Sequence, residues 1–301
     1  MIERDSVRPL LWIIALALLL HAPALDWGFF ADDHGLMCVL ERGPGASATL
    51  RPWSLFDFGT LPEPGSIART EGFLPWWTDV DWKVRFFRPL ASLSHAADWA
   101  VYGRAALGHH ATSLAVYALL LVLLHALYRA AGLSRQVALW ALAIFACEDG
   151  SVVTVGWLAN RNALLEAVFS VAAALVALRA PRPLSQLRVA GVLTLALLAC
   201  GAKESGVSAL LLVAYLFARE RNRVAASIAA LIALGYVAAL LCAGYGTHSV
   251  FYLMPWHAPF EYAARVGAMT VLGTLSACGP FPVDVPVFFP ALFVPWFTVA
   301  L

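Results

Sequence analysis

Long apolar stretches, separated mostly by short polar connections, make up most of this sequence. The first covers residues 10–25, and after a long interruption the others lie at approximately 111–128, 136–147, 162–178, 187–200, 205–218, 224–243, 263–278 and 286–301. A helix needs about 20 apolar residues to cross the hydrocarbon core of a bilayer, and most of these stretches approach that length. The pattern therefore predicts an all-α, multi-pass transmembrane helical bundle of about 8–9 spans.

Three of these stretches need a separate interpretation. Residues 10–25 are predicted to be a retained anchor, because many spans follow; a cleaved signal peptide is the alternative, since Ala22-Pro23-Ala24 loosely resembles a cleavage site. The stretch at 136–147 is short for a crossing, and we expect it to continue past a break near Glu148-Asp149-Gly150 as an irregular buried segment. The sequence stops inside an apolar stretch at Leu301, which leaves a missing C-terminal portion open.

The long interruption, residues 26–108, is the most polar part of the sequence. It holds many of the acidic residues, several prolines and a dense group of aromatic residues. Within it, 73–77 and 82–87 mix aromatic rings with charge or proline, a pattern that predicts short helices in the headgroup region, where Trp is enriched. We therefore expect a single integral membrane domain over residues 1–301, with 26–108 as a first external loop that carries short interfacial helices.

Arginines distinguish the two sides of the predicted membrane. Those in one alternate set of connections are Arg4, Arg8, Arg129, Arg135, Arg179, Arg182, Arg188, Arg219, Arg221 and Arg223. The positive-inside rule makes these connections and the N-terminus cytoplasmic. The opposite connections are then external, and they are 26–108, 148–161, 203–204 and 244–262.

Composition narrows the class of protein further. Of the 301 residues, 61% are hydrophobic and 13% are charged, and the mean hydropathy is +0.76. A soluble domain carries about a quarter charged residues, so the apolar excess is expected to face lipid. The net charge of +1 argues against a nucleic-acid partner. Five scattered cysteines without C-x-x-C spacing predict neither a zinc site nor a disulfide framework.

Ionisable residues gather at the predicted external ends of different helices. They are Asp32, Asp33, Arg88, Glu148, Asp149, Arg161, Lys203 and Glu204. A charge at membrane depth costs about 2.5–3.5 kcal/mol on insertion scales, so such residues indicate either a site or mutual pairing. Their shared side of the membrane is the strongest indication of a site in the sequence.

The adjacent carboxylates Asp32 and Asp33 are the candidate catalytic residues. A carboxylate beside a like charge and close to lipid has a raised pKa, which suits a general base that takes a proton from a hydroxyl group. Alternatively, the segment from Asp33 to Gly35 only caps or turns the chain after the first span. His34 adds an Asp/His set that could hold a divalent metal, although adjacent ligands alone are a weak signal.

Three basic residues are candidates for binding an anion. Arg88 precedes a helix-opening proline, Arg161 begins an apolar helix, and Lys203 lies in a tight turn; each could hold a phosphate oxygen. The alternatives are a snorkelling Arg88, an Arg161 that anchors the interface, and an internal ion pair between Lys203 and Glu204. Glu148-Asp149 could pair with Arg161 or orient an acceptor.

The order of several short motifs resembles a known family. After the first span and its Asp-Asp pair come Phe87-Arg88-Pro89-Leu90, Gly108-His109-His110, Val155-Gly156-Trp157-Leu158-Ala159-Asn160-Arg161 and Ala202-Lys203-Glu204-Ser205. Over roughly residues 8–220 this set resembles the GT-C fold membrane glycosyltransferases, nearest to the protein O-mannosyltransferase branch that includes tetratricopeptide-tailed proteins.

The resemblance implies an enzyme of the bacterial inner membrane. Such enzymes take a sugar from a polyprenyl-phosphate donor in the membrane lipid and pass it, with inversion, to an acceptor protein, glycan or lipid on the periplasmic side. Asp32 or Asp33 would be the catalytic base, with Asp32 slightly favoured. Arg88, Arg161 and Lys203 would hold the donor phosphate, while Glu148, Asp149, Glu204 and His34 would support the acceptor or the site.

The chain also departs from this family. Where many relatives have a His-Pro pair and a later acidic residue, the sequence reads Glu148-Asp149 and Val153, and Asn162-Ala163 follows Arg161 without an acidic residue. These differences leave the acceptor and any divalent metal cofactor open. Two other function classes therefore stay in view: a transporter or flippase for a lipid-linked or anionic solute, and a non-catalytic membrane protein with a GT-C-like fold.

Overall fold

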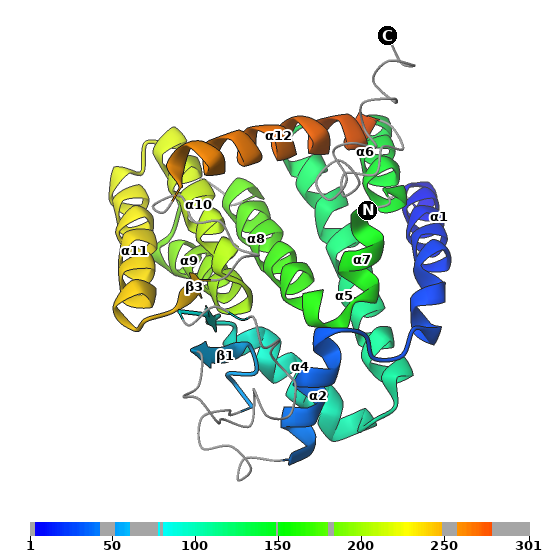
Figure 1. Ribbon diagram of the computed structural model, residues 1–301. Coiled ribbons are helices and arrows are strands. Elements are labelled where there is room, and N and C mark those ends of the chain that lie inside the picture. The colour runs from blue at the N-terminus through cyan, green and yellow to red at the C-terminus, as the bar shows by residue number, and fades with distance from the viewer. Residues whose placement is uncertain are drawn as a thin grey trace, which may run out of the picture.

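The computed structural model describes residues 4–42, 52–60, 78, 81–148, 150–179, 184–248 and 258–278, which are mostly helical (Figure 1). The α-helices are α1 (Arg4–His21), α2 (Asp32–Arg42), α4 (Pro89–Tyr102), α5 (Ala106–Ala130), α6 (Arg135–Cys147), α7 (Gly150–Gly156), α8 (Arg161–Arg179), α9 (Gln186–Ala202), α10 (Val207–Arg219), α11 (Arg223–Cys242) and α12 (Pro259–Cys278). Short 3-10 helices are η1 (Ala22–Asp26), η2 (Leu158–Asn160) and η3 (Glu204–Gly206).

Four helical segments are long and apolar enough to cross a membrane: Val7–Asp26, Ala106–Ala130, Leu158–Arg179 and Arg223–Cys242. A fifth crossing results if α6 and α7, bent by 66° at their junction, form one broken span. The helices thus support a membrane protein. The predicted count of about 8–9 spans is not confirmed, since α9 and α10 hold only 17 and 13 residues. Residues 286–301 lie outside the described part.

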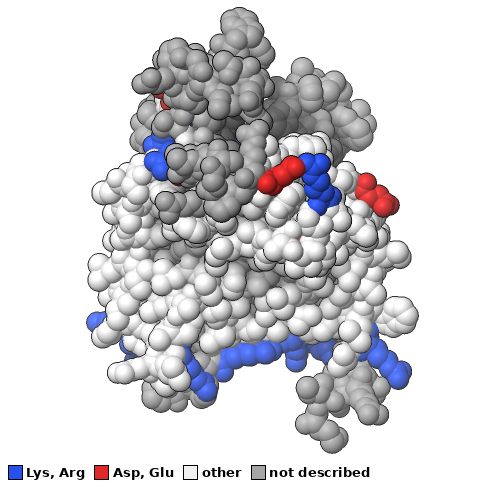
Figure 2. Space-filling model, turned by 90° about the horizontal axis from the view of Figure 1, so that it is seen from below, with Lys and Arg blue, Asp and Glu red and all other residues white. Residues whose placement is uncertain are grey.

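The surface has the charge distribution expected of a membrane protein. Figure 2 shows a broad uncharged area with a row of Lys and Arg side chains along one edge and both acidic and basic side chains toward the opposite edge. Arg129, Arg179 and Arg219 lie in the last turns of α5, α8 and α10. Their charge complements the negative ends of the helix dipoles. The helices that follow, α6, α9 and α11, begin with side-chain caps from Ser134, Ser185 and Asn222.

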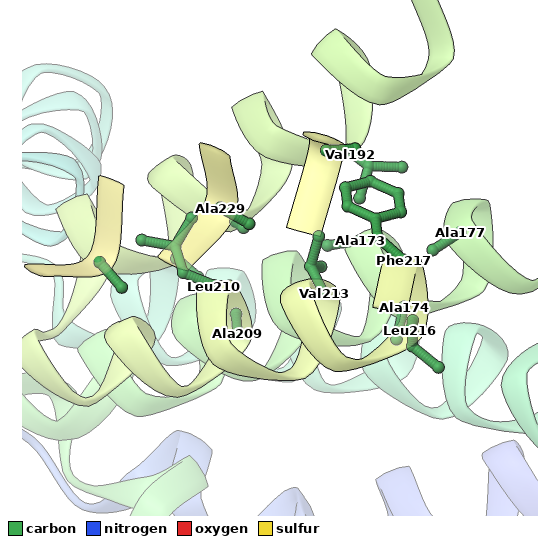
Figure 3. Close-up of a cluster of buried hydrophobic side chains, with 14 of the residues drawn as sticks. Ala173, Ala174, Ala177, Val192, Ala209, Leu210, Val213, Leu216, Phe217 and Ala229 are labelled. Atoms are coloured by element: carbon green, nitrogen blue, oxygen red, sulfur yellow. The ribbon is translucent and has the colours of Figure 1, made fainter. Parts of the chain in front are cut away.

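Small side chains form the core between α8, α9, α10 and α11 (Figure 3). Ala173, Ala209 and Ala229 are almost completely buried there, and Leu210 and Phe217 fill the remaining space. Alanine allows membrane helices to approach closely, where dispersion contacts hold them together. A second apolar cluster joins α1, α5, α6, α7 and α8. The two clusters share α8, which therefore lies at the centre of the described bundle.

A small antiparallel sheet joins two distant connections of the chain. Its strands are β1 (Asp57–Thr60), β2 (Lys83–Arg85) and β3 (Gly246–His248), in the order β1-β2-β3. The first two come from the 26–108 interruption and the third from the 244–262 connection. In Figure 1, β1 lies with α2 and α4 at one end of the bundle. This pairing places the two connections, both predicted to be external, on the same side of the molecule.

The sheet corrects the prediction of a short interfacial helix at 82–87. Val84 is buried while Lys83 and Arg85 are partly exposed, so the segment has the alternation of a strand. Two of the Arg85 guanidinium nitrogens, Nε and Nη2, each donate to the Asp57 carboxylate at 2.8 Å, and these bonds hold β2 against β1. Of the other expected interfacial helices, the one at 73–77 lies outside the described residues; α2 and α4 are helical parts of the same interruption.

Candidate functional site

Asp33 is buried and its carboxylate is held by two backbone N–H groups. Oδ1 accepts a hydrogen bond of 2.6 Å from Ala159 N, and Oδ2 accepts one of 3.0 Å from Phe30 N. Phe30 in turn accepts from Asp33 N at its carbonyl oxygen, so Asp33 caps the start of α2 reciprocally. The capping alternative therefore describes Asp33 well, and the carboxylate also fastens α2 to the 3-10 turn η2.

The environment of Asp33 favours its protonated form. Burial raises the pKa of Asp33 from 3.8 to about 6, although the hydrogen bonds from Phe30, Ala159 and Leu158 act in the opposite direction. The negative charge of Asp32 raises the pKa of Asp33 a little further. Asp33 thus changes between its charged and neutral forms near pH 6.

Asp32 differs from its neighbour because it is exposed. Its carboxylate has no ion pair or hydrogen bond within the described ranges. Ala31, just before it, has a φ of +48°, which is uncommon for a residue with a side chain and is held by the bonds around Asp33. His34 is exposed as well, and its ring lies 6.4 Å from that of Phe29. Asp32 is therefore accessible at the protein surface, whereas Asp33 is not.

Arg161 is completely buried in a polar network. Its Nε donates to Ser113 Oγ at 3.0 Å, and its Nη2 donates to the His109 carbonyl oxygen at 2.6 Å. Its Nη1 donates to Asp98 Oδ2 at 2.5 Å and to Ser94 Oγ at 3.2 Å. Four hydrogen bonds from one guanidinium leave little capacity for a phosphate. In this arrangement Arg161 is a partner of α4 and α5.

Asp98 was not among the residues singled out in the sequence. Besides Arg161 it accepts a hydrogen bond of 2.9 Å from Thr112 Oγ1. The available signal was the one acidic residue of a helix whose other residues, apart from His95, are apolar or small. His95, one turn earlier, is fully buried; neither ring nitrogen has a hydrogen-bond partner, and burial lowers its pKa well below 6.5. His95 therefore stays neutral beside the Arg161 network.

Arg88 lies at the start of α4 and contacts the turn after α9. Its Nε donates to Glu204 Oε2 at 3.0 Å, and its guanidinium lies 4.0 Å from the ring centre of Phe86. The side chains of Arg88 and Glu204 are 13% and 29% exposed, so their ion pair is partly shielded from water. Glu204 is thus the partner of Arg88, and the predicted pair of Lys203 with Glu204 is not formed.

Lys203 occupies the same turn without an ion pair in the described part of the chain. Burial lowers its pKa, and the nearby charge of Arg88 lowers it further, while Glu166 and Glu204 raise it. Gly206 allows this turn to fold back: a Cβ there would lie 2.2 Å from the carbonyl carbon of Ala199. The close approach places Lys203 near Arg88.

Glu166 is a second acidic residue that the sequence reasoning missed. It lies on α8, five residues after Arg161, where a charge inside an apolar helix is itself a signal of a site. Its Oε1 accepts a hydrogen bond of 2.7 Å from Ser170 Oγ. Its electrostatic effect on Lys203 shows that the two groups are near each other.

Glu148 is half-buried at the junction of α6 and α7. Its carbonyl oxygen accepts a 2.7 Å hydrogen bond from Ser151 Oγ, and Ser151 Oγ also lies 2.8 Å from His21 Nε2. Arg161 pairs with Asp98, so the pairing of Arg161 with Glu148, one of the two alternatives left open by the sequence, is not formed. Asp149 lies outside the described residues.

Three separate hydrogen-bonded contacts link these distant segments in series. Asp33 connects α2 to η2, Arg161 connects α8 to α4, and Arg88 connects α4 to η3. An apolar cluster that includes Met37, Phe56 and Ala159 fills the space between α2 and α4. Most of the predicted site residues are therefore linked through their elements, with packed side chains between the Asp33 and Arg88 ends.

The described residues contain no group of three or more His, Cys, Asp or Glu side chains arranged to hold a metal ion. In the Asp32, Asp33 and His34 set considered for a metal, both Asp33 oxygens accept backbone N–H bonds. Comparisons with protein families, curated proteins and solved structures find no match to this chain. The resemblance of its motifs to a family therefore stays a prediction.

Proposed function

We propose that the protein is a membrane-embedded glycosyltransferase of the GT-C type, acting on the periplasmic side. One observation carries the proposal. Hydrogen bonds of Asp33, Arg88, Arg161 and Glu204 connect the helices and turns at one end of the bundle. In the same region, the acidic Asp32 and the basic Lys203 have no ion partner among the described residues. A base and a cation are the two charges that transfer from a lipid phosphate requires.

In this proposal Asp32 is the general base. It accepts the proton of an acceptor hydroxyl as the hydroxyl oxygen bonds to the anomeric carbon of the sugar. The bond from that carbon to the phosphate oxygen breaks on the opposite face, so the product is inverted. The polyprenyl phosphate leaves as an anion, and Lys203 with Arg88 would stabilise its charge. Asp33 would keep Asp32 in place.

The supporting residues take narrower roles in this proposal. Glu204 orients Arg88 through their ion pair, since the guanidinium keeps further N–H groups for an anion. His34, Glu148 and Asp149 are proposed on the acceptor side. Arg161, which the resemblance placed at the donor phosphate, supports the site from within, because its hydrogen bonds are directed to Asp98, Ser94, Ser113 and His109.

The test is sugar transfer by the purified protein in proteoliposomes that contain a polyprenyl-phosphate sugar and a candidate acceptor. Asp32→Asn keeps the size of the side chain and removes the base, so transfer should fall by about 100-fold or more. Asp26→Asn, which changes a nearby carboxylate at the end of η1, is the matched control and should keep the wild-type rate. Full transfer by the Asp32→Asn variant would reject the assigned base.

A non-catalytic membrane protein is a second candidate, and the internal pairing favours it. Asp33, Arg88, Arg161 and Glu204 all have partners inside the chain, as residues that only hold a fold together would.

The bend of 66° between α6 and α7 favours a transporter, because discontinuous helices line many transport sites. Flux of a lipid-linked solute across vesicles without a glycosylated product would support the transporter.

A further inference from the structure

We propose that Asp98 and Arg161 are positioning residues: their buried ion pair fixes the turn η2, whose backbone N–H groups hold Asp33 beside Asp32. The functional half of this inference rests on the proposed glycosyltransferase, while the structural half does not. Arg161 follows η2 directly and is separated from Ala159 by one residue. Its side chain is completely buried, and so is the carboxylate that Ala159 binds.

The first step of the argument concerns how firmly Arg161 is held. The four acceptors around its guanidinium come from two helices, since Ser94 and Asp98 lie on α4 while His109 and Ser113 lie on α5. A planar guanidinium with acceptors on three nitrogens has one orientation that satisfies all of them. Arg161 therefore fixes the start of α8 against both helices.

The second step runs from Arg161 to Asp33. The turn η2 is short, and Asn162 closes it by donating from Nδ2 to the Ala159 carbonyl oxygen at 2.8 Å. Ala159 N then points at Asp33 Oδ1, which it reaches at 2.6 Å. The start of a helix presents free N–H groups and positive charge to an anion. Displacement of Arg161 would therefore move the donor of this hydrogen bond.

The third step concerns charge. Asp33 and Arg161 are near enough to interact electrostatically, and Asp98 on α4 is the direct ion-pair partner of Arg161 on α8. A variant that removes the charge of Asp98 or Arg161 would change the proton affinity of Asp33 through space, whatever happens to the turn. Arg161→Lys is the informative variant, because lysine keeps the positive charge and lacks the planar set of guanidinium N–H donors.

The experiment measures the proton affinity of Asp33 in the full-length protein without any transfer assay. Dicyclohexylcarbodiimide reacts with protonated carboxyl groups in apolar surroundings, and mass spectrometry of the peptide that contains Asp33 gives the labelled fraction at each pH. In the wild type, the labelled fraction of Asp33 should fall as the pH rises, with a midpoint near pH 6. The Asp33→Asn variant identifies which labelled peptide signal belongs to Asp33.

The Arg161→Lys variant should raise this midpoint by about 0.5–1 pH unit, because Asp33 loses N–H bonds that stabilise its charged form. Arg179→Lys changes an exposed arginine at the other end of the same helix and should leave the midpoint unchanged. An unchanged or lowered midpoint in Arg161→Lys would overturn the inference. If Arg161→Lys does not fold, the double variant Ser94→Ala with Ser113→Ala, which changes no charge, replaces it. The labelling midpoint of this double variant should rise by a smaller amount. An unchanged midpoint would again overturn the inference.

A transfer assay then separates the two proposals. If the protein transfers sugar, Arg161→Lys should lower kcat by about 10-fold or more and leave the donor KM near its wild-type value, since it displaces the base and not the phosphate site. A rise in donor KM alone would assign Arg161 to the phosphate and contradict the positioning role. A shifted labelling midpoint in a protein without transfer would keep the positioning network and reject the glycosyltransferase.

Discussion

The Asp33 carboxylate accepts a 2.6 Å hydrogen bond from the backbone N–H of Ala159, 126 residues later in the chain. This bond joins the segment after the first membrane helix to the start of α8. The two neighbouring carboxylates therefore have different environments, because Asp33 is buried in the protein and Asp32 is exposed. A sequence that places both charges in one dipeptide therefore yields one structural residue and one available residue.

The first prediction concerns the pH dependence of stability. The pKa of Asp33 is 3.8 in the unfolded chain and about 6 in the folded protein, so the folded state binds the proton more tightly. The Asp33 contribution to stability is thus largest below about pH 4 and falls as pH rises to about 6, by a few kcal/mol at most. Thermal unfolding of wild type and Asp33→Asn between pH 4 and 7.5 should show this difference.

In that experiment, Asp33→Asn should lose stability relative to wild type as the pH falls. The other carboxylates are the same in both proteins, so their contributions cancel in the comparison. Glu261→Gln changes an exposed carboxylate on α12 and serves as the control. Parallel pH curves for wild type and Asp33→Asn would contradict the assigned environment of Asp33.

The second prediction concerns the turn that presents Lys203. Gly206→Ala places a Cβ 2.2 Å from the carbonyl carbon of Ala199, a backbone atom that cannot move away cheaply. We expect a loss of about 2 kcal/mol or more of unfolding free energy. Gly191→Ala on α9 meets nothing within 4 Å and should be neutral or stabilising by up to about 1 kcal/mol. Equal thermal midpoints for the two variants would argue against the close approach.

The third prediction concerns the Arg88–Glu204 ion pair. Glu204→Gln leaves the Arg88 charge, which is 13% exposed, with a neutral partner. A double-mutant cycle with Arg88→Gln should give a coupling energy of about 1 kcal/mol, above the value of most exposed pairs. The exposed pair Arg265–Glu261 is the comparison, and its cycle should give less. A coupling energy of zero for Arg88 and Glu204 would mean that the pair does not hold α4 against η3.

The fourth prediction concerns the sides of the membrane. Ser205 and Arg221 are both exposed, at opposite ends of α10. In a cysteine-free background, Ser205→Cys should react with a membrane-impermeant thiol reagent added on the side of the membrane predicted to be external, and Arg221→Cys should react only after the membrane is opened. The reverse pattern would invert the orientation, and equal reactivity without opening would argue against a membrane crossing by α10.

Sequence patterns predicted the helices well because their cause is local. The apolar stretch at 111–128 lies within α5, and 162–178 within α8, with ends only a few residues away. Periodic apolar residues and the need to satisfy backbone groups in lipid require nothing from distant parts of the chain. The break near Glu148 was predicted for the same reason, since charges and Gly150 interrupt an apolar stretch.

The sheet and the Arg161 network escaped sequence reasoning because both depend on distant partners. β2 and β3 are three residues each, too short for a pattern of alternation, and only their pairing makes them strands. Arg161 at the head of an apolar helix has the same sequence signature whether it holds a phosphate or an internal carboxylate. Its partner Asp98 lies 63 residues earlier, and no local spacing joins the two.

The pairing of Val84 with Thr247 also has a consequence for biosynthesis. β2 cannot complete the sheet until β3 has left the ribosome, 163 residues later, after α4 to α11 have been made. Until then its edge stays open and available to other extended chains. Pairing of these two connections is therefore a late step of assembly.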